Sequence, residues 1–313
     1  MLVPTAFNAL KSSRSISWSP TGRLQQTLAG CLELSGISLH SGKVAKVKLC
    51  PEFAGRGRYF DFKSNFIPAS IDYAEDSPLC TTLSKDGFKI RTVEHLLSAM
   101  EAMGVDNCRI VITNEDAKDS EVEVPIFDGS AGKWVDAIEE IGLKLAIDQC
   151  GNFCEKMAPH VNQPVHVWRN DCFLIAFPAT EVRITYGIDF PQVPEIGCQW
   201  FFTAPLDNKF YAEQIAPSRT FCIYEEVGVE QMRNMGLIKG GSMENALVCR
   251  VVMLCTQIFF AAYWKGFKWT SSCFPLQKCK SVLQLRSPQY FLSSFLHQLT
   301  PKCMLIEEDI LSK

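Results

Sequence analysis

Residues 81–104 carry the pattern that most restricts the fold of this chain, a β-hairpin that runs straight into a helix. The segment "TTLSKDGFKIRT" turns at Asp86-Gly87, a dipeptide that tolerates the positive φ angles of a tight turn. Thr92 is expected to cap the helix and Gly104 to end it. Apolar residues follow helical spacing between them, at Val93, Leu96, Leu97, Met100 and Met103. Strands followed by a helix are typical of α+β folds rather than of βαβ alternation.

Similar patterns surround this segment and predict a first α+β domain over residues 25–147. Two strands are expected within residues 27–50, joined by a turn at residues 39–42. "NCRIVIT" predicts a further strand. "DGSAGKWVDAIEEIG" predicts a loop and a second helix that ends at Gly142.

The second half repeats this order. After a break at residues 148–159, strands are predicted at "PVHVW", "CFLIAF", "EVRITYGIDF" and "CQWFFTA", which are rich in β-branched and aromatic residues. Helices are predicted at residues 207–215 and 225–234, and a glycine-rich loop at residues 239–242. We therefore expect a second α+β domain over residues 158–249, so that two similar domains each layer a β-sheet with helices.

Composition limits the class of protein. The chain has 313 residues, enough for two domains with cores of their own, and a net charge of −3. A nucleic-acid partner is not expected, because phosphate binding requires a strong basic bias. The 14 cysteines include no C-x-x-C pair, so buried free thiols are a better interpretation than a cysteine-based zinc or redox site.

The N-terminal segment has a composition of its own. No acidic residue occurs before Glu33, whereas serines and the basic residues Lys11, Arg14 and Arg23 are interspersed. This composition is typical of an organelle transit peptide, and a plain disordered terminus is the alternative. We expect residues 1–24 to be a transit or disordered segment and the protein to be mitochondrial, with a plastid as the alternative.

Five segments carry a resemblance to a known family. In this order they are "SGISLHSG", "TVEHLLSAMEAMGVDN", "EVPIFDGSAG", "SRTF" and "GLIKGGSMENALV". Together, over residues 25–248, they resemble the UDP-3-O-acyl-N-acetylglucosamine deacetylases, the zinc enzymes of the committed step in lipid A synthesis, and the plant organellar form looks nearest. The resemblance implies two similar α+β domains with the active site in the cleft between them, and a UDP-linked acylated glucosamine as substrate.

Glu94 and His95 are the candidate catalytic pair. A catalytic zinc ion normally has three protein ligands and a water, whose proton a nearby carboxylate removes. On the dipeptide alone, a helix-capping turn explains these residues better than a metal site. The resemblance reverses that preference, because it implies that His95 is the first zinc ligand and Glu94 the general base.

The resemblance assigns further residues. It implies that the Thr220 hydroxyl stabilises the oxyanion. From the residues themselves, Asp128 in "FDGS" is expected to have a structural, turn-stabilising role. The residues expected to contact the substrate or its acyl chain are His40, Leu83, Phe221, Gly240 and Gly241. His160 and His166 have no metal-like partner nearby in the sequence, so we interpret them as packing or surface residues.

The other half of the expected site is missing from the sequence. The resemblance implies that an H-K-x-x-D segment supplies two more zinc ligands and that a G-H-A-L histidine is the general acid. After Val248 the only histidine is His297, and no K-x-x-D follows it. With one of three ligands found, we expect poor retention of zinc, and we expect the second domain to be incomplete. Two alternatives follow: a zinc-dependent deacetylase with unrecognised ligands, or an inactive relative that binds the nucleotide sugar or pairs with an active paralogue.

Residues 250–313 form an atypical tail without family resemblance. From Arg250 to Ile306 there is no acidic residue, and cysteines and aromatic residues are dense. The uncharged run "VVMLCTQIFFAAYW" is shorter than the about 20 residues that span a bilayer, so we expect no transmembrane segment. An altered splice junction, a retained intron or a frame change explains this composition, and divergence to a new role is the alternative.

Overall fold

The structure is a computed structural model. It describes residues 15–77, 79–114, 120–169, 172–194, 196–202, 205–224, 229–249 and 281–285. Residues 1–14 and most of the tail, with His297, therefore lie outside the described residues, and the predictions made for them stay predictions.

The first half is built on two sheets. The larger has the strand order β3-β4-β10-β5-β6, in which only β10 and β5 run parallel. Its strands are β3 (Leu32–Ile37), β4 (Val44–Pro51), β5 (Arg58–Phe62), β6 (Asn65–Pro68) and β10 (Cys108–Asn114). The smaller has the order β11-β9-β8-β7, with β7 (Ala74–Glu75), β8 (Thr82–Lys85), β9 (Phe88–Arg91) and β11 (Glu121–Glu123). A short 3-10 helix, η1 (Ile71–Tyr73), precedes β7.

The hairpin that restricts the fold is confirmed. Strands β8 and β9 pair antiparallel up to Lys85 and Phe88, so Asp86 and Gly87 alone form the turn. Their φ angles are 52° and 83°, which is the left-handed backbone that an Asp-Gly turn requires.

The two helices of the first half, α2 (Glu94–Met103) and α3 (Gly132–Ile141), are also confirmed. Gly104 ends α2 with a φ of 81°, where a side chain would be strained. The prediction that Thr92 caps α2 is wrong: the cap position is Val93, which makes no side-chain cap bond. Thr92 lies one residue too early and donates its hydroxyl hydrogen bond to Glu123 instead, at 2.8 Å.

The four strands predicted for the second half are confirmed as β14 (Val165–Arg169), β15 (Cys172–Pro178), β16 (Arg183–Phe190) and β17 (Gly197–Phe202). The atypical tail adds a fifth strand, β20 (Ser281–Leu285), between β15 and β16. It runs parallel to β15 and antiparallel to β16. A segment without family resemblance thus lies in the middle of this sheet.

Helical segments follow the sheet as predicted. The segment over residues 207–215 consists of α4 (Asn208–Phe210) and the π-helical turn η2 (Tyr211–Ile215), capped by the Asp207 carboxylate, which accepts a hydrogen bond from Phe210 N at 2.7 Å. Helix α6 (Val229–Asn234) forms the described part of the second one. Two short parallel strands, β18 (Phe221–Ile223) and β19 (Leu247–Cys249), flank α6 in the sequence.

Two strand pairs hold the N-terminal strands, one to the second half of the chain and one within the first half. Strand β1 (Ile16–Leu24) pairs with β13 (Glu155–Val161), and β2 (Gln26–Leu28) pairs with β12 (Leu143–Leu145). The expectation of disorder is therefore wrong for residues 16–24, because β13 pairs antiparallel with Ile16–Pro20 and with Leu24 of this strand. The segment without regular structure that was expected at residues 148–159 is also shorter than predicted, since β13 begins at Glu155. Cleavage of the segment as a transit peptide stays a prediction.

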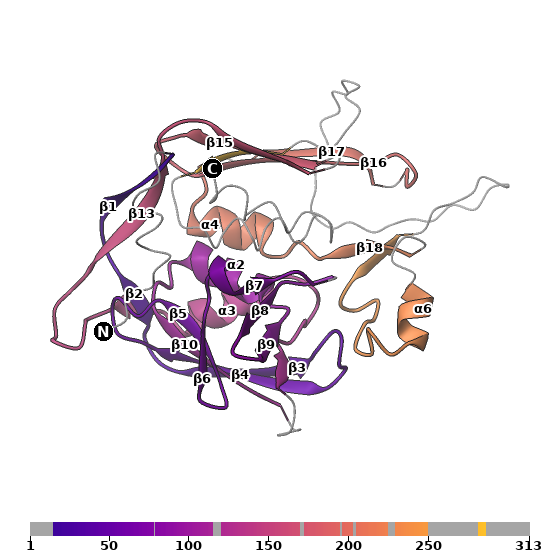
Figure 1. The fold of residues 1–313 in the computed structure, drawn as a ribbon, viewed down its shortest axis with the longest axis horizontal. Coiled ribbons are helices and arrows are strands. Elements are labelled where there is room, and N and C mark those ends of the chain that lie inside the picture. Colours follow the sequence, from indigo (N-terminus) through magenta and orange to yellow (C-terminus); the bar gives the residue numbers. More distant parts are fainter. Residues whose placement is uncertain are drawn as a thin grey trace.

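One continuous hydrophobic core spans both halves. It contains Met100 and Trp134 from the helices of the first half together with Ile184 and Tyr211 from the second. Helices α2, α3 and α4 accordingly lie between the first-half strands and the sheet of the second half (Figure 1). The α+β class is confirmed. Two similar domains with a cleft between them stay a prediction, and in the described residues the two halves share this core.

None of the helices in the described part of the chain is long and apolar enough to cross a membrane.

Candidate active site

Glu94 is the first residue of α2, and its carboxylate is enclosed at the N-terminus of that helix. Only 6% of the residue is exposed, and Oε2 accepts a hydrogen bond from Thr81 N at 3.0 Å. Burial raises the pKa of Glu94 to about 7, and the nearby Glu123 charge adds to the rise, while bonds from the backbone N–H groups of Glu94 and Thr81 oppose it. A carboxyl group that titrates near neutral pH suits a general base.

His95 follows directly and is equally buried, with 4% exposed. Burial lowers the pKa of His95 to about 4, and the charge of Asp128 opposes the shift. The ring is therefore uncharged at neutral pH. Its Nδ1 is buried and has no hydrogen-bond partner among the described residues. An uncharged imidazole with an available nitrogen is the form that binds metal ions.

The loop around Asp128 contacts Thr220. Thr220 N donates to Gly129 O at 2.7 Å, so Thr220 lies beside Asp128, whose charge reaches His95. Asp128 accepts hydrogen bonds from the backbone N–H and the hydroxyl of Ser130, which agrees with the structural role expected for it. Gly129 has a φ of 82°, and a Cβ there would lie 2.1 Å from Asn245 O.

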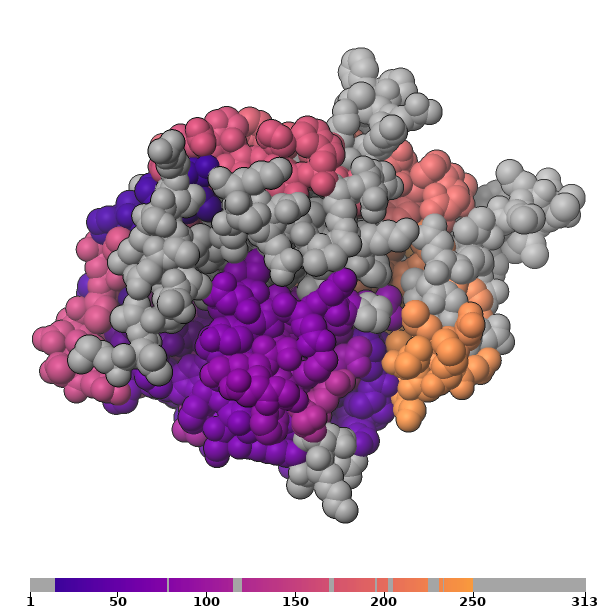
Figure 2. Space-filling view, in the orientation of Figure 1, coloured from indigo at the N-terminus to yellow at the C-terminus, as the bar shows by residue number. Residues whose placement is uncertain are grey.

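A second contact joins the "LHSG" turn to the glycine-rich loop. Lys239 N donates to His40 O at 3.0 Å, and Gly240 N donates to Leu39 O at 3.0 Å. A Cβ on Gly240 would lie 2.1 Å from Ser38 O, so the two backbones touch. In Figure 2 the orange segment that contains residues 229–249 lies against the first half of the chain. All five segments of the resemblance thus lie in one connected region.

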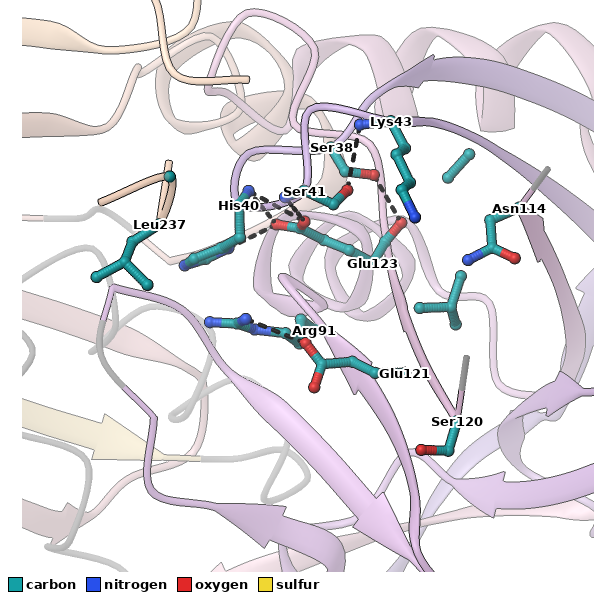
Figure 3. A pocket seen from close by; sticks show the side chains of 13 residues that line it. Ser38, His40, Ser41, Lys43, Arg91, Asn114, Ser120, Glu121, Glu123 and Leu237 are labelled. Atoms are coloured by element: carbon teal, nitrogen blue, oxygen red, sulfur yellow. Dashed lines mark hydrogen bonds and ion pairs between the residues drawn. The ribbon is translucent and has the colours of Figure 1, made fainter. Parts of the chain in front are cut away.

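His40 borders a cavity of about 400 Å³ between the first-half strands and the loop at Gly236-Leu237. Its Nδ1 lies 2.7 Å from Glu123 Oε1, and its Nε2 is buried without a hydrogen-bond partner among the described residues. On the other side of the cavity Arg91 pairs with Glu121 at 3.1 Å (Figure 3). Its size and mixed charge suit a polar small molecule.

Comparison with known proteins decides the family. The family model for UDP-3-O-acyl N-acetylglycosamine deacetylase matches residues 25–257. The chain belongs to this deacetylase family. The family is one of hydrolases, and its match extends past Val248, where the resemblance noted in the sequence ended.

Relatives at two levels of sequence identity agree with this deacetylase assignment. "Probable UDP-3-O-acyl-N-acetylglucosamine deacetylase 1, mitochondrial" of Arabidopsis thaliana is 63% identical over 243 residues, which cover 78% of this chain and 74% of the relative. UDP-3-O-acyl-N-acetylglucosamine deacetylase of the bacterium Trichormus variabilis is 41% identical over 234 residues, 72% of this chain and 78% of the relative. The resemblance is confirmed, and the Arabidopsis name supports a mitochondrial rather than a plastid localisation.

The other residues that the deacetylase resemblance assigned are more scattered. Leu83 is 3% exposed and packs in the main core, so its contact with an acyl chain stays a prediction. Phe221 packs edge-on against Phe190, with ring centroids 5.6 Å apart, in a smaller core of the second half. His166 stacks edge-on with Trp168, which is 61% exposed, as a surface residue does.

In the described residues of this deacetylase chain, the candidate ligands do not complete a zinc site. His95 offers one uncharged imidazole, and the described residues contain no group of three or more His, Cys, Asp or Glu that could hold a metal ion. A tetrahedral zinc ion needs three such ligands besides its water. The described residues therefore do not fit a catalytic zinc ion.

Sequence reasoning missed Glu123. This residue ends β11 with 4% exposed and contacts both His40 and Thr92. The sequence carries no local signal for it: in "SEVEVPIF" the two acidic residues are two positions apart, so strand alternation places both on the same face, opposite Val122.

Proposed function

We propose that the site around Glu94 and His95 is built for hydrolysis of the acetamide of UDP-3-O-acyl-N-acetylglucosamine, the reaction of lipid A biosynthesis for which the family is named. The observation that carries the proposal is the adjacency, at one helix start, of a buried carboxyl with a pKa near 7 and a buried, uncharged imidazole. The mitochondrial names of the Arabidopsis relatives support a mitochondrial location for this activity.

Two residues of this chain have proton-handling roles in that reaction. As water attacks the amide carbonyl, Glu94 takes the proton from the water oxygen, which its near-neutral pKa allows. The Thr220 hydroxyl donates a hydrogen bond to the carbonyl oxygen as negative charge develops there. Departure of the amine then requires a proton from an acid, and the sequence lacks the G-H-A-L histidine that the resemblance implies for this role.

A second candidate function is favoured by the donor set of the chain as written. His95 is one imidazole, and neither H-K-x-x-D nor G-H-A-L occurs in the 313 residues. Loss of two of three ligands removes most of the free energy that holds a catalytic zinc ion. The cavity beside His40 does not depend on these segments. We therefore propose that this chain binds the UDP-linked acyl glucosamine without hydrolysing it appreciably, alone or paired with an active paralogue.

Zinc content and substrate affinity separate the two candidates. The full chain is dialysed against zinc, its metal is quantified, and binding of UDP-3-O-acyl-N-acetylglucosamine is measured by calorimetry. The binding candidate predicts substoichiometric zinc together with measurable substrate binding. One tightly held zinc ion per chain would instead support the hydrolase, and absence of any binding would refute the second candidate. His95→Gln is the control for zinc held at this site.

A further inference from the structure

We propose that Glu123 is a positioning residue that orients His40 and the start of α2 together, so that the Nε2 of His40 is offered to a ligand in the cavity as a hydrogen-bond acceptor. Only the identity of that ligand rests on the proposed function; the orientation itself is a property of the fold.

The Glu123 carboxylate is saturated with hydrogen bonds from two directions. From the "LHSG" turn it accepts bonds from His40 N at 3.0 and 3.1 Å, from Ser41 N at 3.2 Å and from the His40 ring at 2.7 Å. From the segment before α2 it accepts a bond from the Thr92 hydroxyl at 2.8 Å. Figure 3 shows His40 and Ser41 converging on this one side chain. Its position at the end of β11 therefore links two segments that carry candidate site residues.

The charge state of Glu123 determines which nitrogen of the His40 ring carries the hydrogen. Burial opposes ionisation, but the bonds from His40 and Thr92 outweigh it and lower the pKa of Glu123. An ionised carboxylate can only accept, so His40 Nδ1 carries the proton that lies between them. In the neutral ring the lone pair then lies on Nε2. That atom is buried in the wall of the cavity and has no partner among the described residues. A hydroxyl or N–H group of a ligand is its complement.

Thr92 gives an independent reason for the same role. It has a φ of 58° and is 1% exposed, and a β-branched residue in that region is a genuine outlier. Such a conformation persists only where its surroundings fix it. The bond to Glu123 supplies this restraint directly before Val93, Glu94 and His95. One carboxylate therefore fixes both the orientation of the His40 ring and the backbone conformation of Thr92, which leads into the candidate catalytic pair.

The test is ¹⁵N NMR of the histidine rings in the full chain, at about pH 8.5, where an ordinary imidazole is neutral. The chain has five histidines, and the signal lost in His40→Gln identifies His40. We expect His40 as the Nδ1–H form with an unprotonated Nε2 in the unsubstituted chain. The Nε2–H form for His40 would overturn the proposal, and this measurement needs neither zinc nor substrate.

Glu123→Gln extends the test, with Glu121→Gln as the matched control. The amide introduced by Glu123→Gln has an N–H group where the carboxylate now accepts hydrogen bonds from His40 and Thr92. We therefore expect that the Nδ1–H form is no longer the dominant form of His40 in this variant. Glu121 lies two residues away on the same strand and borders the same cavity, but pairs with Arg91. Glu121→Gln should leave the His40 signals unchanged. An unchanged His40 form in folded Glu123→Gln, or an equal change in both variants, would contradict the positioning role.

Discussion

The hydroxyl groups of Tyr211 and Ser98 share a buried hydrogen bond of 2.6 Å that joins the second half of the chain to α2. Ser98 lies on the helix that begins with Glu94 and His95, and Tyr211 is 1% exposed in the common core. The position of the candidate site thus depends on contact between the two halves.

Tyr211→Phe tests this contact. The substitution keeps the ring but removes the hydroxyl, which leaves Ser98 buried without this partner, and we expect a loss of about 1–2 kcal/mol in the free energy of unfolding. Denaturant titration of the full chain measures it. The control is Tyr73→Phe, because the ring of Tyr73 lies 5.9 Å from Lys85 Nζ and Phe retains that contact. Equal effects of the two substitutions would contradict the prediction.

Glu94→Gln should stabilise the protein at alkaline pH. The folded-state pKa of about 7 lies above the ordinary value of 4.5, so the contribution of Glu94 is fully present below pH 4.5 and is lost as pH rises through 7. Relative to the unsubstituted chain, we expect Glu94→Gln to gain about 3 kcal/mol between about pH 4.5 and pH 8. Unfolding by denaturant at several pH values checks this. Glu139→Gln on an exposed position of α3 is the control and should show no such trend.

His95→Gln should have the opposite pH dependence. Its folded-state pKa of about 4 lies below the ordinary 6.5, so its contribution is present above pH 6.5 and is lost as pH falls through 4. We expect His95→Gln to gain about 3 kcal/mol over the unsubstituted chain between about pH 7 and pH 4. Because this trend opposes that of Glu94, the unsubstituted chain should show little net change between about pH 4.5 and 6.5 from these two groups. A gain for both variants at the same end of the pH range would refute the assignment.

Gly240 and Gly241 should differ sharply in their tolerance of a side chain. A Cβ at Gly240 would lie 2.1 Å from Ser38 O, a backbone atom, whereas at Gly241 the nearest atom is Ile238 O at 3.2 Å. We expect Gly240→Ala to cost about 2–4 kcal/mol by separating the two loops, and Gly241→Ala to cost about 1 kcal/mol or less. Thermal unfolding measures the difference. Equal costs would show that the two loops are not in contact.

The sequence predicted those parts of the fold that are decided locally. Asp86-Gly87, the apolar spacing of α2 and Gly104 each specify a local conformation, and all three predictions hold. Contacts between distant segments were the ones missed. Thr92 was taken for a cap because a hydroxyl before a helix usually finds the helix N–H groups, but Glu123 competes for it from another strand. Strand β1 was missed because its partner β13 lies more than a hundred residues later.

The candidate site was predicted as far as a resemblance could assign it. Glu94 and His95 were found from their motif, and burial then explains the shifted pKa values that suit their roles. Glu123 could not be assigned, because its role depends on a turn and a strand end that only the folded chain brings within hydrogen-bond distance, at 3.0 Å and 2.7 Å.

Acetate release decides whether the chain as written hydrolyses the substrate class that we propose it binds. The full chain, supplied with excess zinc, is incubated with UDP-3-O-acyl-N-acetylglucosamine, beside a chain whose C-terminal segment carries H-K-x-x-D and G-H-A-L. We predict no release above background for the first and turnover for the second, which Glu94→Ala should largely abolish. Zinc-dependent acetate release by the chain as written would contradict the account, because His95 would then have ligand partners that its sequence and described structure do not reveal.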